Sequence, residues 1–196
     1  MSDGFEVREK EYYKHLKHLL KSSRDNAGLK NDIYQTIVDA PFYDPLVATY
    51  LELGIIVLLL VDEESHLINR VALSNTVHAA GAIKTSEKHF REIKIPLNYE
   101  KNIISAAIIS GHGRHTEDWK DLFVPALSAS SARFNQAGAG ITWSLVEPFV
   151  YGNHRAAVIF SFFNTPSSVK RTKRFTSTYA KMLAKLLASF DSDQMN

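Results

Sequence analysis

Two histidines and two carboxylates fall within seven residues near the middle of the chain, at His112, His115, Glu117 and Asp118. Imidazoles and carboxylates in such a group are able to ligate a divalent metal ion or to transfer a proton. Glu117 and Asp118, however, also fit the first turn of a short helix, where acids are favoured. The sequence shows neither distal ligands nor residues to orient them. We therefore predict no bound metal, and keep His112 and His115 as the residues on which a metal-assisted hydrolase would depend.

Aromatic residues in and beside the aperiodic stretch 112–141 indicate a second kind of site, an apolar pocket for a small molecule. Such pockets combine apolar walls with a few polar anchors. The predicted ligand-binding residues are four rings and three polar side chains: Trp119, Phe123, Phe134, Trp143, Asp118, Arg133 and Ser144. The alternative is that these rings simply fill the core beneath a loop, which would leave no pocket.

Motifs of several common enzyme classes are missing. Gly111-His112-Gly113 and Gly138-Ala139-Gly140 each supply two glycines, but no lysine-serine or lysine-threonine pair follows them, as a phosphate-binding loop requires. Both are interpreted as loop glycines. The sequence also lacks the glycine-x-serine-x-glycine elbow of serine hydrolases and the paired-histidine helix of zinc proteases.

Composition excludes further classes of function. The 196 residues include no cysteine, which removes disulfide frameworks, thiolate zinc sites, iron–sulfur clusters and thiol nucleophiles. The longest apolar run, 55–61, is far shorter than the roughly 20 residues of a membrane span. The charged N-terminus shows no apolar stretch typical of a secretory signal. We therefore expect a cytoplasmic protein with no membrane partner.

The charge pattern gives no support for nucleic-acid binding. The net charge of +2 is too small to steer the whole molecule towards an anionic polymer. A basic run, Lys170–Arg174, begins the last predicted helix, where cations are mildly unfavourable. No aromatic stacking platform accompanies this run, so we interpret it as a solvated face and expect no nucleic-acid partner.

Helices are predicted to frame the chain and to flank its irregular middle. Apolar residues recur every three to four positions in the long terminal segments, and a polar turn separates the first two helices. A glycine in the left-handed conformation is expected to end the helix before residue 111. The predicted helices span residues 5–21, 29–38, 103–109, 116–123 and 126–134, and a long C-terminal helix, entered through residues 166–168, carries an apolar stripe over 175–190.

Strands are predicted between these helices. The β-branched run 55–61 has the length of a strand buried on both faces, and it pairs with 67–74 as a hairpin. A second hairpin is predicted over 141–163, around a Tyr-Gly-Asn-His turn. The alternating segment 90–96 is predicted as another strand, ended by its proline, and the small residues 78–85 as a loop.

The order of these elements resembles that of the GAF domain, a regulatory module that binds small molecules. Ile55–Asp62 is similar to the family's first strand, and Ile95-Pro96 precedes a helix as in the family. Gly140–Phe149 resembles its strand containing glycine, serine and proline. The resemblance spans residues 30–190. It implies an α+β domain with an antiparallel sheet of about six strands, N- and C-terminal helices on one face, and short helices and loops that form a pocket on the other.

The resemblance implies a sensor that dimerises through its terminal helices. Family members that reduce methionine sulfoxide or attach a bilin use cysteines, which this chain lacks, and the signature of cyclic-nucleotide members is absent. We therefore predict a non-catalytic module that binds an unidentified small molecule and signals to a separate effector protein; no cofactor is identified. We expect an N-terminal helix over 1–28, a GAF-like domain over 29–190 and a tail over 191–196. A structural dimerisation or adaptor module and the histidine-dependent hydrolase remain the alternatives.

Overall fold

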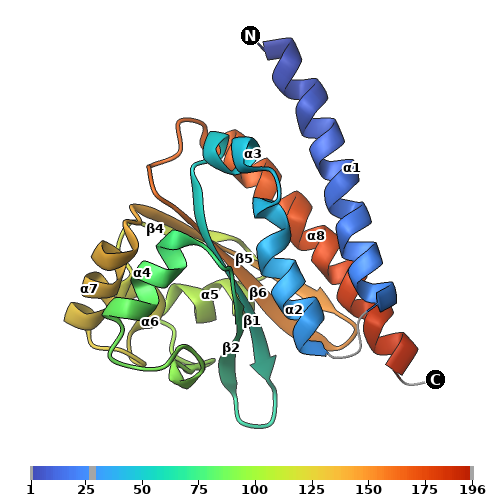
Figure 1. Ribbon diagram of the computed structural model, residues 1–196. Helices are drawn as coiled ribbons and strands as arrows, with labels where there is room; N and C mark the ends of the chain where they lie inside the picture. The colour runs from blue at the N-terminus through green and yellow to red at the C-terminus, as the bar shows by residue number, and fades with distance from the viewer. Residues whose placement is uncertain (1, 27–29, 195–196) are drawn as a thin grey trace.

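Six antiparallel strands form one curled sheet at the centre of the protein (Figure 1). The computed structural model describes the backbone of residues 2–26 and 30–194, and the side chains of residues 10–22 and 33–190. Within these ranges the strand order is β3-β2-β1-β6-β5-β4. The strands are Leu53–Asp62 (β1), Leu67–Leu73 (β2), Ile95–Pro96 (β3), Arg114–Thr116 (β4), Trp143–Tyr151 (β5) and His154–Phe162 (β6). The predicted α+β class and the antiparallel sheet are confirmed.

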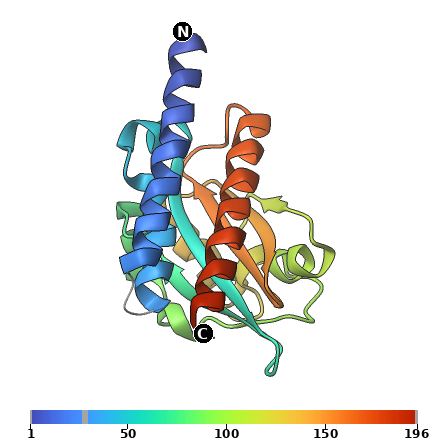
Figure 2. The same cartoon turned by 90° about the vertical axis from the view of Figure 1, so that its right-hand side faces the viewer.

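Helices cover both faces of this sheet (Figure 1). One side, which we call the terminal-helix face, carries α1 (Ser2–Asn26), α2 (Lys30–Asp39) and α8 (Val169–Gln194). The other side, the pocket face, carries α4 (Val77–Thr85), α5 (Ile103–Ser110), α6 (Lys120–Phe123) and α7 (Ala129–Ala139). A short 3-10 turn, Ala40–Phe42, and helix α3 (Pro45–Tyr50) lead from α2 into β1. Figure 2 shows α1 and α8 running in the same direction across the sheet, with the first turns of α1 projecting beyond it.

Strand β1 carries an unbroken apolar run, 55–61, because both of its faces are covered. Its alternate residues Ile56 and Leu58 enter the core of the terminal-helix face, whereas Val57 and Leu59 enter the core of the pocket face. All four side chains are no more than 3% exposed. The unbroken apolar run that predicted a doubly buried strand therefore has a direct structural cause.

The core of the terminal-helix face is aromatic and its polar atoms are paired. Phe160 packs edge-on against Phe175 and Tyr179, with centroid separations of 5.8 and 6.1 Å. The buried hydroxyl of Tyr179 donates to the Ile37 carbonyl oxygen at 2.5 Å. Burial raises the pKa of Tyr179 well above its ordinary value, so this hydroxyl stays a neutral donor. Helices α2 and α8 are thereby tied together.

Two predicted elements on the pocket face differ from the structure. Residues 78–85, predicted as a loop, belong to helix α4, whose N-terminus is capped because Thr76 Oγ1 accepts from the Ala79 main-chain N at 3.1 Å. The predicted strand 90–96 shrinks to Ile95–Pro96, since a reciprocal cap between His89 and Glu92 holds Phe90–Glu92 in a 3-10 turn. Alternating polarity alone did not reveal this local hydrogen bonding.

Other boundaries shift by a few residues. Ser128 caps α7, so the helix predicted over 126–134 begins at Ala129 and continues to Ala139. Helix α1 continues to Asn26 through most of the predicted turn, while residues 27–29 lie outside the described chain. Helix α8 continues to Gln194, within the segment predicted as a tail. Among the helices described, none is long and apolar enough to cross a membrane.

Candidate functional site

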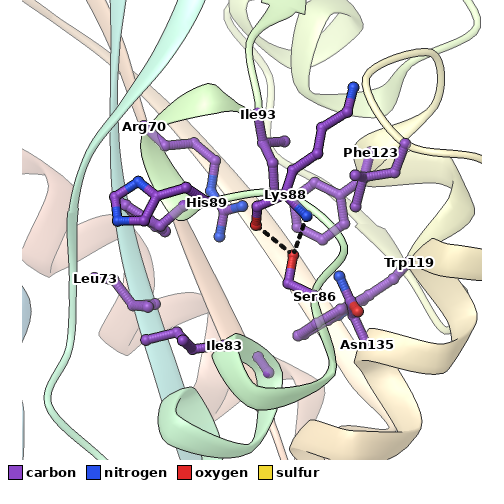
Figure 3. Close-up of a pocket in the computed structure, with 13 residues that line it drawn as sticks. Arg70, Leu73, Ile83, Ser86, Lys88, His89, Ile93, Trp119, Phe123 and Asn135 are labelled. Atoms are coloured by element: carbon purple, nitrogen blue, oxygen red, sulfur yellow. Dashed lines mark hydrogen bonds between the residues drawn. The ribbon is translucent and has the colours of Figure 1, made fainter.

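A cavity of about 90 Å³ lies on the pocket face, between β2, the segment before β3, and helices α4, α6 and α7 (Figure 3). Most of its wall is apolar or aromatic. The main apolar contributors are Leu73, Phe90, Ile93, Trp119, Phe123 and Leu127. Arg70 on β2 and Asn135 on α7 add polar groups from different walls. Apolar walls with a few polar groups are the usual design of a small-molecule site.

A β-bulge in the β1–β2 hairpin, between Arg70 and Ala72, brings Leu73 to the same side of the sheet as Arg70. Leu59 pairs with Arg70 and Val57 pairs with Leu73, so two residues of β2 oppose one residue of β1 between these pairs. Arg70 and Leu73 both line the cavity as a result. In a regular strand, residues three positions apart point to opposite faces. Bulges of this kind re-aim side chains and are frequent beside functional sites.

The guanidinium of Arg70 has aromatic neighbours but no counter-ion among the described residues. Its carbon lies 4.2 Å from the Phe90 ring centroid and 5.0 Å from that of Phe123, so both contacts are of the cation–π type. Its Nε is buried and has no hydrogen-bond partner. Burial lowers the pKa of Arg70 from 12.5 to about 9, which still leaves the side chain protonated at neutral pH.

Asn135, which lines the same cavity, carries a second unsatisfied polar atom. Its side chain is 4% exposed, and its Oδ1 has no hydrogen-bond partner. Asparagine is a poor residue for a helix interior, and an unpaired buried polar atom costs about 1–3 kcal/mol. Across the described side chains, Arg70 Nε and Asn135 Oδ1 are the only buried nitrogen or oxygen atoms in this condition. Both belong to residues that line one cavity.

The Trp119 indole is held in place from behind. Its Nε1 donates to Ser144 Oγ at 3.0 Å, and Ser144 Oγ lies 2.8 Å from Ser161 Oγ. The Trp119 main-chain N donates to Gln136 Oε1 at 2.8 Å. Phe123 packs edge-on against the indole, with the ring centroids 5.4 Å apart. One wall of the cavity is therefore positioned by contacts that need no ligand.

The structure separates the seven binding residues predicted from the sequence. Trp119 and Phe123 line the cavity, while Ser144 lies behind Trp119 as its hydrogen-bond acceptor. Asp118 and Arg133 contact each other instead. Arg133 Nε and Nη2 donate to Asp118 Oδ2 at 2.9 and 2.8 Å. This ion pair lies outside the cavity lining.

The remaining two predicted residues point away from the cavity. Phe134 is 64% exposed on α7, whereas its neighbour Asn135 is buried. Trp143 belongs to the core of the terminal-helix face. Because successive strand residues face opposite sides, Trp143 and Ser144 are separated by the sheet although they are adjacent in sequence.

The histidine cluster does not assemble into a metal site. His112 and His115 are both exposed, and His112 Nδ1 contacts the Ser110 carbonyl oxygen at 2.6 Å. The His115 ring packs beside Trp143, with the ring centroids 5.4 Å apart. The described residues contain no group of three or more histidines, cysteines or acids positioned to hold a metal ion. The hydrolase alternative therefore gains no geometric support.

Sequence reasoning missed the two polar residues of the cavity, although each leaves a signal. Arg70 interrupts the otherwise weakly polar strand Leu67–Leu73 at a position that pairs with buried Leu59. Asn135 lies in a helix rich in alanine and serine, without a capping role. Both are polar residues at positions where periodicity demands apolar ones, and this is the pattern that would have found them.

The fold is that of a GAF domain. The GAF domain of a phosphoenolpyruvate-protein phosphotransferase from Coxiella burnetii matches with a TM-score of 0.61 at 10% identity, over 93% of this chain and 96% of that chain. The corresponding domain from Acinetobacter matches with a TM-score of 0.59 at 11% identity, over 98% and 97%. No family model and no curated protein matches the sequence. At these identities the likeness shows the fold alone.

A third structural match corrects the prediction that the chain is not an enzyme. The structure of fRMsr of Staphylococcus aureus in its reduced form matches with a TM-score of 0.54 at 11% identity, over 90% of this chain and 95% of that chain. That protein is a methionine-R-sulfoxide reductase, so chains with this fold include enzymes. A chain with this fold can be an enzyme, so the prediction of a non-catalytic module, which rested on the missing cysteines and motifs, is corrected.

Proposed function

We propose that the protein is a regulatory sensor that binds a small molecule in the cavity between β2, α4, α6 and α7. The observation that carries this proposal is that the two buried atoms without a partner, Arg70 Nε and Asn135 Oδ1, belong to residues that line one cavity with aromatic walls. Groups of this kind destabilise a protein unless something pairs with them. A ligand that contacts both would supply the missing partners. The GAF-like fold agrees with a sensory role.

The edge of the cavity is connected to the helices of the other face. Leu73 lines the cavity, and its carbonyl oxygen accepts from Gln35 Nε2 on α2 at 3.0 Å. Two residues later, the Asn75 main-chain N donates to Asp39 Oδ1 at the end of α2, at 2.7 Å. A ligand that moved the end of β2 would therefore also pull on α2, against which α1 packs.

We further propose that the output surface is formed by the terminal helices, which would pair two copies or contact a separate effector protein. Helices α1 and α8 lie side by side on the face opposite the cavity (Figure 2). A ligand shifts such an output only if it binds two arrangements of the protein with different affinity. We propose that the two arrangements differ in the contacts of Gln35 and Asp39, which connect the cavity edge to α2.

The first experiment asks whether the cavity binds any small molecule. A metabolite library is screened against the purified chain by thermal shift, and hits are measured by calorimetry. We expect at least one compound to stabilise the protein and to bind less well to Trp119→Ala. Phe134→Ala serves as the control, because its exposed ring lies outside the cavity. A library without hits, or hits unaffected by the Trp119 variant, would contradict the proposal and favour the adaptor alternative.

The second experiment tests the route to α2. Hydrogen exchange of α2 amides is compared with and without a hit compound, in the unaltered chain and in Gln35→Ala. We expect binding to change exchange in α2, and the change to shrink in the variant while affinity stays within about threefold. Equal responses in both chains would mean that the Gln35 contact carries no signal.

A further inference from the structure

The surroundings of Arg70 restrict the chemistry of the ligand. Phe90 and Phe123 approach the guanidinium at 4.2 and 5.0 Å from their ring centroids. The two rings pack against the guanidinium carbon, and the N–H groups remain as the part of the side chain that hydrogen-bonds a ligand. Nε is the buried donor without a partner. A carboxylate that pairs with Nε and one terminal nitrogen together matches the edge of the guanidinium in two parallel hydrogen bonds.

The charge balance of the cavity favours a single negative charge. No aspartate or glutamate is among the residues that line it. Lys88 also lines it, but its ammonium donates to the Ala126 carbonyl oxygen at 2.7 Å. Lys88 is exposed and solvent screens its charge, so Arg70, whose Nε is buried, is the one desolvated cation of this lining, and it has no counter-ion among the described residues. A dianion such as a phosphate monoester would bring a second charge to apolar walls, at a cost that a carboxylate avoids.

Size and hydrogen bonding restrict the rest of the molecule. The cavity of about 90 Å³ is smaller than the roughly 150 Å³ cavity that holds one benzene ring in an engineered protein. The enclosed part of the ligand is therefore a few heavy atoms and not a nucleotide. Asn135 Oδ1 requires a hydrogen-bond donor. Because the lining is already cationic, a neutral hydroxyl suits it better than an ammonium group.

We propose that the ligand is a small hydroxylated carboxylic acid, whose carboxylate pairs with the edge of Arg70 and whose hydroxyl donates to Asn135 Oδ1. This assignment rests on the sensor function proposed above. It names the class of ligand, which neither the fold nor the structural matches indicate. Figure 3 shows Arg70 and Asn135 reaching the cavity from separate walls, as contact with two ends of one small molecule requires.

The test uses glycolate and lactate as probes. Each is compared with its uncharged amide and with the acid that lacks the hydroxyl, namely acetate and propionate. Binding to the unaltered chain is measured by calorimetry. Trp143→Phe leaves Trp119 as the only tryptophan, so its fluorescence reports on the cavity. We expect one hydroxy acid to bind about 10- to 100-fold more tightly than its amide, and several-fold more tightly than its deoxy analogue.

Variants assign the two contacts separately. Arg70→Met is expected to lose the preference for the acid over the amide, and Asn135→Ala the preference for the hydroxy acid over the deoxy acid. Arg91→Met is the control, because Arg91 is exposed and does not line the cavity. If all the acids fail while inorganic phosphate, AMP or an amide changes Trp119 fluorescence, the carboxylic-acid assignment is overturned and the sensor function survives. If neither these probes nor the library binds, both fall.

Discussion

The two faces of the sheet treat buried polar groups in opposite ways. On the terminal-helix face, the hydroxyls of Tyr12 and Tyr179 donate to main-chain carbonyls at 3.0 and 2.5 Å, within a filled aromatic core. On the pocket face, Arg70 Nε and Asn135 Oδ1 are buried beside a cavity and have no partner. One layer is built to be stable. The other keeps groups that a purely structural core would replace with apolar side chains.

The difference indicates that one face of the sheet mainly stabilises the domain, whereas the other face is suited to binding. A satisfied buried hydrogen bond contributes about 1 kcal/mol, whereas an unsatisfied group costs about 1–3 kcal/mol. Residues that lower stability without a structural return are characteristic of binding sites. Truncating a packed core residue of the terminal-helix face and replacing an unpaired polar residue of the pocket face should therefore change stability with opposite sign.

The largest expected effect is on the terminal-helix face. Phe160→Ala removes a fully buried ring that packs against Phe175 and Tyr179, and it should lower the free energy of unfolding by about 3–5 kcal/mol. Urea titration measures the change. Phe134→Ala, the same substitution at a ring that is 64% exposed, should change it by less than about 0.5 kcal/mol. Equal losses in both variants would mean that the aromatic core is not what stabilises this face.

The next effect concerns how the pocket helices cross. A Cβ on Gly81 of α4 would lie 2.3 Å from the Gly138 carbonyl oxygen of α7, so Gly81→Ala forces the two helices apart. Although alanine favours a helix, we expect a net loss of about 1–3 kcal/mol and weaker binding of any cavity ligand. Lys84→Ala, an exposed change on the same helix, is the control. If Gly81→Ala were instead more stable than the unaltered protein, helices α4 and α7 would not need to pack this closely.

The third prediction has the opposite sign. Arg70→Met removes a charge that has no counter-ion among the described residues, and it leaves an apolar side chain of similar length beside Phe90 and Phe123. Loss of the cation–π contacts offsets part of the gain. We expect the free energy of unfolding to rise on the order of 1–2 kcal/mol, measured by urea titration without ligand. A destabilised variant would show that the guanidinium is structural, and the contrast between the faces would then fail.

The fold was predictable because its signals are local. The doubly buried run 55–61 and the Tyr151–His154 turn each specify their element from neighbouring residues. Helix α4 was not predicted because its residues are small and its apolar residues do not form a stripe along one side. Two of its larger apolar residues are exposed instead, Val77 at 82% and Ile83 at 58%. Strand β4 was missed since three residues carry no measurable period.

The site was less predictable because it depends on tertiary placement. Trp119 and Phe123 line the cavity, but Arg70 lies on β2, far from them in sequence, and only the packing of the helices over the sheet brings them together. Asn135 and Phe134 are adjacent, and the choice between them depends on which side of α7 faces the sheet. The prediction chose residues because they lie near an aromatic stretch of the sequence. It therefore found two residues that line the cavity, Trp119 and Phe123, together with others that only lie near it.

The smallest expected effect concerns a half-buried carboxyl group on the terminal-helix face, and how far its neighbours offset the cost of burying its charge. Glu147 on β5 is half-buried, and burial raises the pKa of its carboxyl above 4.5. Thr176 Oγ1, which donates at 3.5 Å, and the nearby Lys173 and Lys181 on α8 offset only part of this effect. The carboxylate is therefore less well accommodated than the protonated acid.

A raised pKa in the folded state means that the native protein holds this proton more tightly than the unfolded chain does. The contribution to stability is thus complete below the ordinary pKa and is lost as pH rises through the raised one. Glu147→Gln should match the unaltered protein near pH 4, exceed its stability by less than about 1 kcal/mol at pH 7, and flatten the decline between. Urea titrations across this range measure the difference. A variant that is less stable at pH 7 would mean that Lys173 and Lys181 fully compensate the carboxylate, and that the terminal-helix face satisfies even its half-buried charge.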